Sequence, residues 1–393
     1  MVRDKERAGR IQRVLSENNW DGLVCTLPSN VLLLSGYWPV IGNAAAIFAR
    51  DGAVIVVAPE DERELAGQGW ADEVRTFEGG SLQNLKTISE SVREALSGVG
   101  ARSGSVFGYE ASASFDPATY AATFHYGAGI RAVLGGAFPA VVLVDATTRL
   151  ARLRAVLTDR ELGMVRQACD IARQGFMSAT AGIHAGMREF EIAALLKGGL
   201  LRGAPSDQRC DGFAYCMSGP NSTQAFAAFQ QTRARAIEEG DFVLLHCNSY
   251  CGGFWTDITR TFTIGRPDSQ KAAITDAVVE ATRKAIGEVR PGVRASDVDA
   301  AAREVMNARG YGKAFVHGTG HGVGFAAINH SALPRIHPLS DEILEAGMVF
   351  NIEPAAYIDR VGGMRQCNMA AVTDRGAELL TGFQNEADEL VLE

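Results

Sequence analysis

The sequence predicts an α+β protein of two domains, a smaller N-terminal α/β domain over residues 1–155 and a larger domain over residues 156–393. Helix-like and strand-like stretches alternate in the first half, which favours an α/β layer with a partly parallel sheet. This alternation of helix-like and strand-like stretches ends near residue 155. The second half contains two similar segments that each follow a long helical stretch. With 393 residues, 47% of them hydrophobic, the chain is long enough to bury two cores.

The N-terminal domain is expected to begin with an amphipathic helix, followed by apolar strand-like runs and a second helix. The expected elements, in chain order, are a helix over 2–18, strands over 22–26, 44–49 and 53–58, a helix near 81–98 and a strand over 105–109. Alternation of this kind is typical of a sheet that contains parallel strand pairs, because parallel neighbours need a long connection.

The C-terminal domain is expected to open with a long helix. Thr158 and Glu161 form a capping-box pattern, and apolar residues recur at helical spacing after it. The segment 184–194 resembles the segment 290–300, and each copy opens another helix. Two helix pairs related by duplication would pack on one curved sheet, and a cleft would lie between the halves.

Charge and cysteine usage exclude several functional classes. A formal net charge of -8 without an evident basic patch argues against nucleic acid and membrane surfaces as partners. The N-terminus is rich in charged residues and has no apolar signal region, so we expect a cytoplasmic protein. Seven scattered cysteines without a CxxC pair indicate neither a disulfide framework nor a zinc knuckle.

Three apolar segments of the C-terminal domain contain polar residues that would be costly to bury without partners. The first covers residues 240–263, where apolar runs flank Gly252 and Gly253. A hairpin at these glycines would bring His246 and Asp257 together. Asp257 could also be one of the polar residues that are common near hairpin turns, so its spacing from His246 does not decide whether it has a functional role.

The second segment covers residues 315–326 and contains four glycines. These glycines disfavour a helix, so His317 and His321 are not a helical zinc-binding pair. On an extended strand their even spacing would place both rings on one face. Glycine also allows close approach of the backbone to another group, which favours a functional role for the two histidines.

The third segment ends in Glu353, which follows an apolar strand and precedes Pro354. A carboxylate in such surroundings requires a cation or a hydrogen-bond donor. Arg365 and Cys367 occupy a second strand-like run shortly afterwards. A cysteine in this position is more often a small buried side chain than a functional thiol.

These segments contain the sequences TDITRTF, HGTGHGVG and GMVFNIEP. Their residues, their order and their spacing resemble the motifs of one family. It is the family of Xaa-Pro aminopeptidase, prolidase, methionine aminopeptidase and creatinase. The resemblance covers residues 155–393 and implies the pita-bread fold of that family, preceded by a separate α/β domain. It also implies a homodimer and a hydrolase that cleaves a C–N bond in a small substrate, with an Xaa-Pro peptide as the first guess.

In the metal-dependent members, two aspartates, one histidine and two glutamates hold two divalent ions. The resemblance places three of these ligands on Asp257, His321 and Glu353, whereas His246 and Cys367 stand where the other two are expected. Only two carboxylates then face four positive charges, so a two-metal centre is not expected. One zinc, iron or manganese ion on the three matching residues with Cys367 is chemically reasonable, and His246 is a further candidate ligand.

A metal-free reaction, like that of creatinase, is the alternative. In that case His246, His317 or His321 would activate water, and Arg365 would hold a substrate carboxylate or a guanidino-linked group. In either hydrolase His317 would stabilise the developing oxyanion, and Glu353 or a histidine would handle the proton.

Three further hypotheses remain open. Peptidases of this family carry a second catalytic histidine shortly after the glycine-rich motif, and His330 is displaced from that place by two positions. It could serve only in a rearranged loop. The chain could also be a ligand-binding protein without catalysis, or, on weaker grounds, use Cys247 or Cys367 as a nucleophile.

Overall fold

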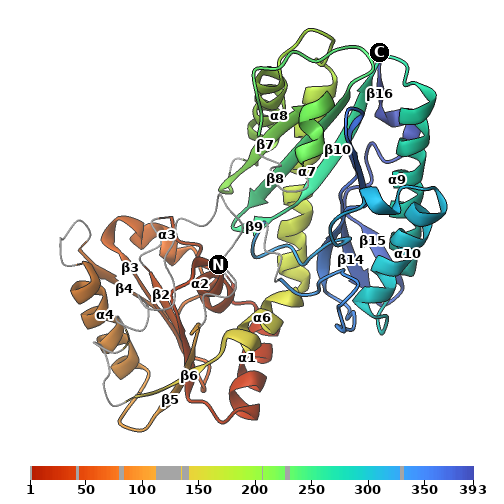
Figure 1. The fold of residues 1–393 in the computed structure, drawn as a ribbon. Coiled ribbons are helices and arrows are strands. Elements are labelled where there is room, and N and C mark those ends of the chain that lie inside the picture. Colours follow the sequence, from red (N-terminus) through yellow and green to blue (C-terminus); the bar gives the residue numbers. More distant parts are fainter. Residues whose placement is uncertain are drawn as a thin grey trace. The chain divides into compact units, whose positions relative to one another are not determined.

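The structure of the chain is a computed structural model, and it forms two compact units, Met1–Arg154 and Ala155–Glu393 (Figure 1). It describes residues 2–40, 44–78, 84–111, 134, 141–205, 207–225, 231–327 and 332–393. Among these residues, no helix combines the length and the apolar character needed to span a membrane.

The N-terminal unit contains a sheet in the order β4-β3-β2-β1-β5-β6. Its strands are β1 (Gly22–Cys25), β2 (Ala45–Ala49), β3 (Val54–Pro59), β4 (Glu73–Phe77), β5 (Val106–Tyr109) and β6 (Val142–Asp145). The pairs β3/β4, β1/β5 and β5/β6 are parallel, and the other two pairs are antiparallel. The partly parallel sheet predicted from the alternation is therefore confirmed.

The helices of this unit are α1 (Lys5–Glu17), α2 (Pro28–Ser35), α3 (Arg63–Gly67), α4 (Asn84–Gly98) and α6 (Thr147–Ala155), with the 3-10 helix η1 (Glu60–Glu62). The sequence reading missed α2, because its residues from Asn30 to Ser35 are all buried and its apolar side chains show no helical period. The buried carboxylate of Glu110 accepts hydrogen bonds from Leu27 N and Asn30 Nδ2 at the start of α2.

The C-terminal unit contains two helix pairs, as the internal repeat predicts. The helices are α7 (Asp159–Thr180), α8 (Glu189–Gly203), α9 (Ser269–Glu288) and α10 (Ala295–Ala308). Helix α7 packs on α8 and α9 packs on α10 (Figure 1). The predicted capping box of Thr158 and Glu161 starts α7.

The strands of this unit form a main sheet in the order β16-β10-β8-β7, with β9 paired to β8, and two smaller sheets, β11-β14-β15 and β12-β13. Their bounds are β7 (Cys210–Ser218), β8 (Phe242–Cys251), β9 (Phe254–Trp255), β10 (Ile258–Ile264), β11 (Val349–Ile352), β12 (Ala355–Ile358), β13 (Gly362–Arg365), β14 (Asn368–Thr373), β15 (Gly376–Leu379) and β16 (Val391–Leu392). The short helices are η3 (Gly219–Gln224), η4 (Gly312–Ala314) and η5 (Ala387–Leu390). Backbone pairing of Thr259 with Cys367 joins β10 to the two-residue link between β13 and β14.

Candidate active site

The hairpin from β8 to β10 places His246 beside Asp257. His246 lies opposite Thr259 in the antiparallel register, and Gly252 and Gly253 form the turn with φ angles of 57° and 90°. Positive φ is favourable only for glycine, so these residues permit the reversal. His246 Nδ1 lies 3.8 Å from Asp257 Oδ1, and both side chains are buried. The hairpin thus brings the two residues together as the sequence predicts.

The two-residue link between β13 and β14 adds Cys367 to this pair. Cys367 N donates to Thr259 O at 3.0 Å, and the Cys367 thiol donates to the backbone carbonyl of Asp257 at 3.0 Å. Glu353 follows β11, and its backbone N donates to Thr319 O at 2.7 Å. One ligand atom from each of Asp257, Glu353 and Cys367 lies within 4.8 Å of the others.

The glycine-rich segment reaches the cluster by close backbone approach to β11, with which it pairs through an isolated antiparallel bridge between Gly322 and Phe350. His321 N donates to Asn351 Oδ1 at 2.7 Å, and Asn351 N donates to His321 O at 3.1 Å. A Cβ atom at Gly320 would lie only 1.9 Å from Asn351 O. The backbone bends at residues 317 and 319, and residues 319–323 then run antiparallel to β11, where Val323 N donates to Val349 O at 3.1 Å.

His317 and His321 have different hydrogen-bond partners, although the charge of Glu353 acts on both rings. His317 Nε2 lies 3.1 Å from the Tyr357 hydroxyl, whereas His321 Nε2 lies 3.5 Å from Asp257 Oδ2. His317 Nδ1 lies 2.8 Å from Gly318 O. A carbonyl only accepts, so Nδ1 carries the proton and Nε2 accepts from the tyrosine. Burial lowers the pKa of His317, which favours this neutral ring.

Helix α10 holds the glycine-rich segment in place through a buried carboxylate. Asp299 accepts hydrogen bonds from Thr319 N at 3.1 Å and from its hydroxyl at 2.8 Å. The neighbouring Arg303 forms an ion pair with Asp299 and donates to His317 O at 2.5 Å. Helix α10 therefore holds the segment at His317 and at Thr319.

His321 is oriented in the way that is typical of a metal-binding histidine. Its Nδ1 donates to Gly322 O at 3.1 Å, so its Nε2 is the atom that faces Asp257. Burial alone would lower the pKa of His321, but the hydrogen bond and the charge of Asp257 outweigh burial and raise it. For Asp257 burial opposes ionisation, yet the two histidines hold its pKa below the ordinary value.

His246 is held by a buried guanidinium. Arg365 donates from Nη2 to His246 Nδ1 at 3.1 Å and from Nε to Thr259 Oγ1 at 3.1 Å, and its Nη1 lies 4.0 Å from Glu353 Oε2. A guanidinium only donates, so Nδ1 accepts and His246 Nε2 donates to Asn248 Oδ1 at 3.1 Å. Both ring nitrogens are engaged by protein groups, which argues against His246 as a metal ligand. The pKa of His246 falls to about 4, mainly because burial disfavours the charged ring.

The neutral state of His246 makes stability depend on pH. The pKa of this ring is about 4 in the folded protein and ordinarily 6.5, so the unfolded chain binds more protons between these values. The free energy of unfolding should therefore fall as the pH drops from 6.5 towards 4, by up to about 3 kcal/mol from this group. Urea unfolding of the wild type and of His246→Gln across this range measures how steeply the free energy of unfolding of each protein changes with pH. Parallel curves would show that His246 is not held neutral.

The donor set fits one divalent cation and does not fit two. His321 Nε2, the carboxylates of Asp257 and Glu353 and the Cys367 thiol are groups that zinc, iron and manganese sites use. Next to them, Arg365 lies between His246 and Glu353 and brings a positive charge. A second divalent ion there would face this guanidinium without additional carboxylates.

The thiols near this cluster have little nucleophilic character. Burial, together with the charges of Asp257 and Glu353, raises the pKa of Cys367 well above its ordinary value. Burial likewise raises the pKa of Cys247. A thiolate is the nucleophilic form, so neither residue is activated in the metal-free protein. His330, the candidate for a second catalytic histidine, lies outside the described residues.

Several polar side chains of the cluster were missed in the sequence. Thr259 and Asn351 lie inside the recognised motifs, and Tyr357 follows Glu353 by four residues. Tyr357 contacts His317, and burial raises the pKa of Tyr357 to about 12. A signal existed for Asn351, because an amide inside an apolar strand needs a partner.

Comparison with known proteins agrees with this geometry. Residues 163–374 match the model of metallopeptidase family M24, and residues 7–156 match that of the Creatinase/Prolidase N-terminal domain. The chain is 29% identical over 384 residues to the Xaa-Pro dipeptidase of Pyrococcus furiosus, covering 97% of this chain and 99% of the relative. It is 32% identical over 278 residues to the "Probable dipeptidase PepE" of Mycobacterium tuberculosis, covering 65% and 72% of the two chains.

Solved structures show the same two-domain fold. The prolidase from Pyrococcus furiosus superposes with a TM-score of 0.73 at 27% identity, over 94% of this chain and 98% of that one. The dipeptidase PepE from Mycobacterium ulcerans superposes with a TM-score of 0.77 at 25% identity, over the full length of both. These matches confirm the pita-bread fold with a preceding α/β domain that the motifs imply, and the chain belongs to metallopeptidase family M24.

Proposed function

We propose that the protein hydrolyses the C–N bond of a short peptide, and that an Xaa-Pro dipeptide is the substrate to test first. The observation that carries this proposal is the convergence of Asp257, His321 and Glu353, from three distant segments, in one buried cluster. The relatives named Xaa-Pro dipeptidase and prolidase support the choice of substrate.

One divalent cation would be held by Asp257, His321, Glu353 and Cys367. When bound, it would supply Lewis-acid polarisation of the scissile carbonyl and a water of lowered pKa. The Nδ1 hydrogen bond of His321 to Gly322 O keeps the Nε2 lone pair of this ring in the ligand position. Cys367 would bind as a thiolate, because a nearby cation reverses the effect of burial on its pKa.

His317 and Tyr357 would handle the proton of the reaction. The neutral His317 ring can accept a proton at Nε2, the atom that contacts the Tyr357 hydroxyl. The imidazolium formed in this way, or the hydroxyl itself, would donate to a developing oxyanion. The hydrogen bond of His317 Nδ1 to Gly318 O keeps the ring in one orientation while this transfer occurs, and Arg303 holds the backbone carbonyl of His317.

Arg365 and His246 would together replace the second cation of the two-metal members. Arg365 is buried and donates to Thr259 and His246, so these contacts support a positioning role rather than capture of a substrate carboxylate. Its fixed positive charge lies near Glu353 and offsets the carboxylates there. The neutral His246 serves as the acceptor that fixes the guanidinium.

Metal analysis combined with a substrate panel tests the proposal. The purified full chain would be loaded separately with zinc, iron or manganese and assayed on Xaa-Pro dipeptides, dipeptides without proline and small amidino compounds. One metal per chain with turnover of Xaa-Pro dipeptides would support it. Turnover of amidino compounds without metal would favour the creatinase-like alternative. Binding without any turnover would favour a ligand-binding protein.

Cys367 is expected to determine which metal is preferred. Cys367→Ser should weaken zinc binding by at least about tenfold and change manganese binding much less, because thiolate is a soft ligand. Competition titrations with a chromogenic chelator measure both dissociation constants. Cys216→Ser, which alters another buried cysteine, is the matched control. Equal losses of zinc and manganese affinity would count against a thiolate ligand.

We also propose that the protein acts as a cytoplasmic homodimer, with residues 1–155 and 156–393 as its two domains. The family resemblance supports the dimer, and seven free cysteines fit a reducing compartment such as the cytoplasm. The compact units Met1–Arg154 and Ala155–Glu393 support the domain boundary. Light scattering on the purified chain measures the mass of the assembly, and a monomer at all concentrations would contradict the dimer.

A further inference from the structure

Two cysteines outside the candidate active site face each other across neighbouring strands. Cys210 is the first residue of β7, and Cys251, opposite it in the register, is the last residue of β8. Their sulfur atoms lie 2.7 Å apart, and both are free thiols. This contact is not part of the cluster around Asp257, and the proposed hydrolysis does not use it.

The backbone at this position is suited to a cross-strand disulfide. Gly252 N donates to Arg209 O at 3.0 Å, so the neighbouring residues form a hydrogen-bonded pair. Antiparallel pairs alternate, which makes Cys210 and Cys251 a non-hydrogen-bonded pair with a Cα separation of about 4.5 Å. Disulfides span Cα separations of roughly 4.4–6.8 Å, so the bond needs no large backbone movement.

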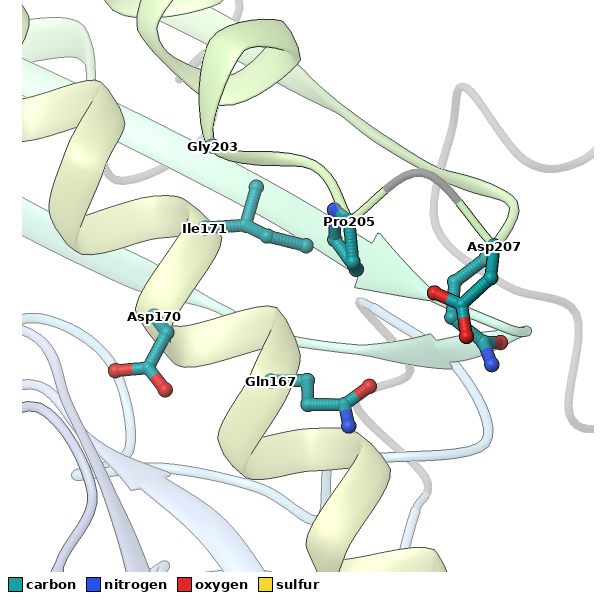
Figure 2. A pocket seen from close by; sticks show the side chains of 7 residues that line it. Gln167, Asp170, Ile171, Gly203, Pro205 and Asp207 are labelled. Atoms are coloured by element: carbon teal, nitrogen blue, oxygen red, sulfur yellow. The ribbon is translucent and has the colours of Figure 1, made fainter.

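The two thiols differ in their access to solvent. Cys251 is buried and lies 3.4 Å from Gln167 Oε1, whereas Cys210 is partly exposed. Gln167 also lines a pocket of about 270 Å³ between α7 and the segment after α8 (Figure 2). Pro205 and Asp207 form the opposite wall of this pocket (Figure 2). The pocket adjoins the pair through Gln167, and the partly exposed Cys210 is the thiol that a small reagent would reach from solvent.

We propose that Cys210 and Cys251 are a redox-modification site that a low-molecular-weight disulfide of the glutathione type converts reversibly to a disulfide. The Cys210 thiolate attacks one sulfur of the reagent, whose S–S bond breaks and releases one thiol. The Cys251 thiolate then attacks Cys210 Sγ in the mixed disulfide and releases the second thiol. The two cysteines lose two electrons and two protons, and the reagent gains both as two thiols.

Formation of this bond should stabilise the C-terminal unit. It closes a loop between residues that are 41 positions apart and restricts the unfolded chain. The bond would lie at the end of β8, the strand that carries His246 and leads into the hairpin that positions Asp257. For a unit of this size, the expected rise in Tm is roughly 5–10 °C.

The test is oxidation of the purified full chain with oxidised glutathione, followed by alkylation and peptide mapping without reduction. We expect a cross-linked peptide pair containing Cys210 and Cys251, a loss of two titratable thiols and the rise in Tm, all reversed by dithiothreitol. Cys210→Ala should abolish these changes. Cys216→Ala, which removes a buried cysteine of the same strand, should retain them.

Three results would overturn the proposal. They are an unchanged thiol content, a stable glutathione adduct on Cys210 without a cross-link, and a cross-link between other cysteines. Peptide mapping of the wild-type chain decides between these results even if Cys210→Ala fails to fold. The outcome is independent of metal loading and of hydrolytic activity, so it is separate from the test of the proposed function.

Discussion

Asp257→Asn is expected to abolish metal binding and to lower kcat/KM for an Xaa-Pro dipeptide by about a thousandfold or more, equivalent to roughly 4 kcal/mol. Asp257 is the carboxylate that contacts both His321 and His246 and that lies beside Cys367. The amide keeps the shape of the side chain but removes the negative charge that a divalent cation requires. Elemental analysis of the dialysed protein and steady-state kinetics measure the two effects.

Asp268→Asn is the matched control for this substitution. Asp268 caps α9 and is exposed, and asparagine is an equally good capping residue. The control should keep its metal content and its activity. If Asp257→Asn instead bound metal normally and kept more than a tenth of the activity, the cluster around Asp257 would not be the reaction centre. Circular dichroism of both variants would show whether the fold is retained.

The contacts that sequence reasoning predicted are those that depend on local rules. The pairing of His246 with Asp257 follows from two glycines at a hairpin turn, and hairpin geometry needs no knowledge of the rest of the chain. The helix pairs followed from the capping box at Thr158 and from the internal repeat. Motif resemblance then added Glu353, whose position near Asp257 cannot be deduced from spacing.

The parts that sequence reasoning missed depend on contacts between distant segments. Even spacing predicted one strand face for His317 and His321, but it could not show that their segment pairs with β11 or that Asn351 holds His321. Similarly, the state of His246 depends on Arg365, which is 119 residues away. A charge count on the ligand set could exclude a second metal ion, but it could not show that a guanidinium lies beside the site.

The double substitution His246→Asp with Cys367→Glu is expected to raise the metal content from one to two divalent ions per chain. It restores the two carboxylates that the two-metal members carry at these positions, so that four negative charges face four positive ones. It also removes the neutral acceptor of Arg365 and gives the guanidinium a carboxylate partner instead. Titration with manganese, followed by calorimetry and elemental analysis, measures the stoichiometry.

The two single variants separate charge from space. Each adds one carboxylate, so each should bind at most one ion tightly and a second ion at least about tenfold more weakly than the double variant does. Cys367 is fully buried, and glutamate is larger, so Cys367→Asp tests whether a smaller carboxylate is accommodated better.

Two tightly bound ions in the wild type would refute the charge argument, because Arg365 would then not exclude the second cation. One ion in a folded double variant would instead show that the space beside Glu353, rather than the missing charge, limits metal binding.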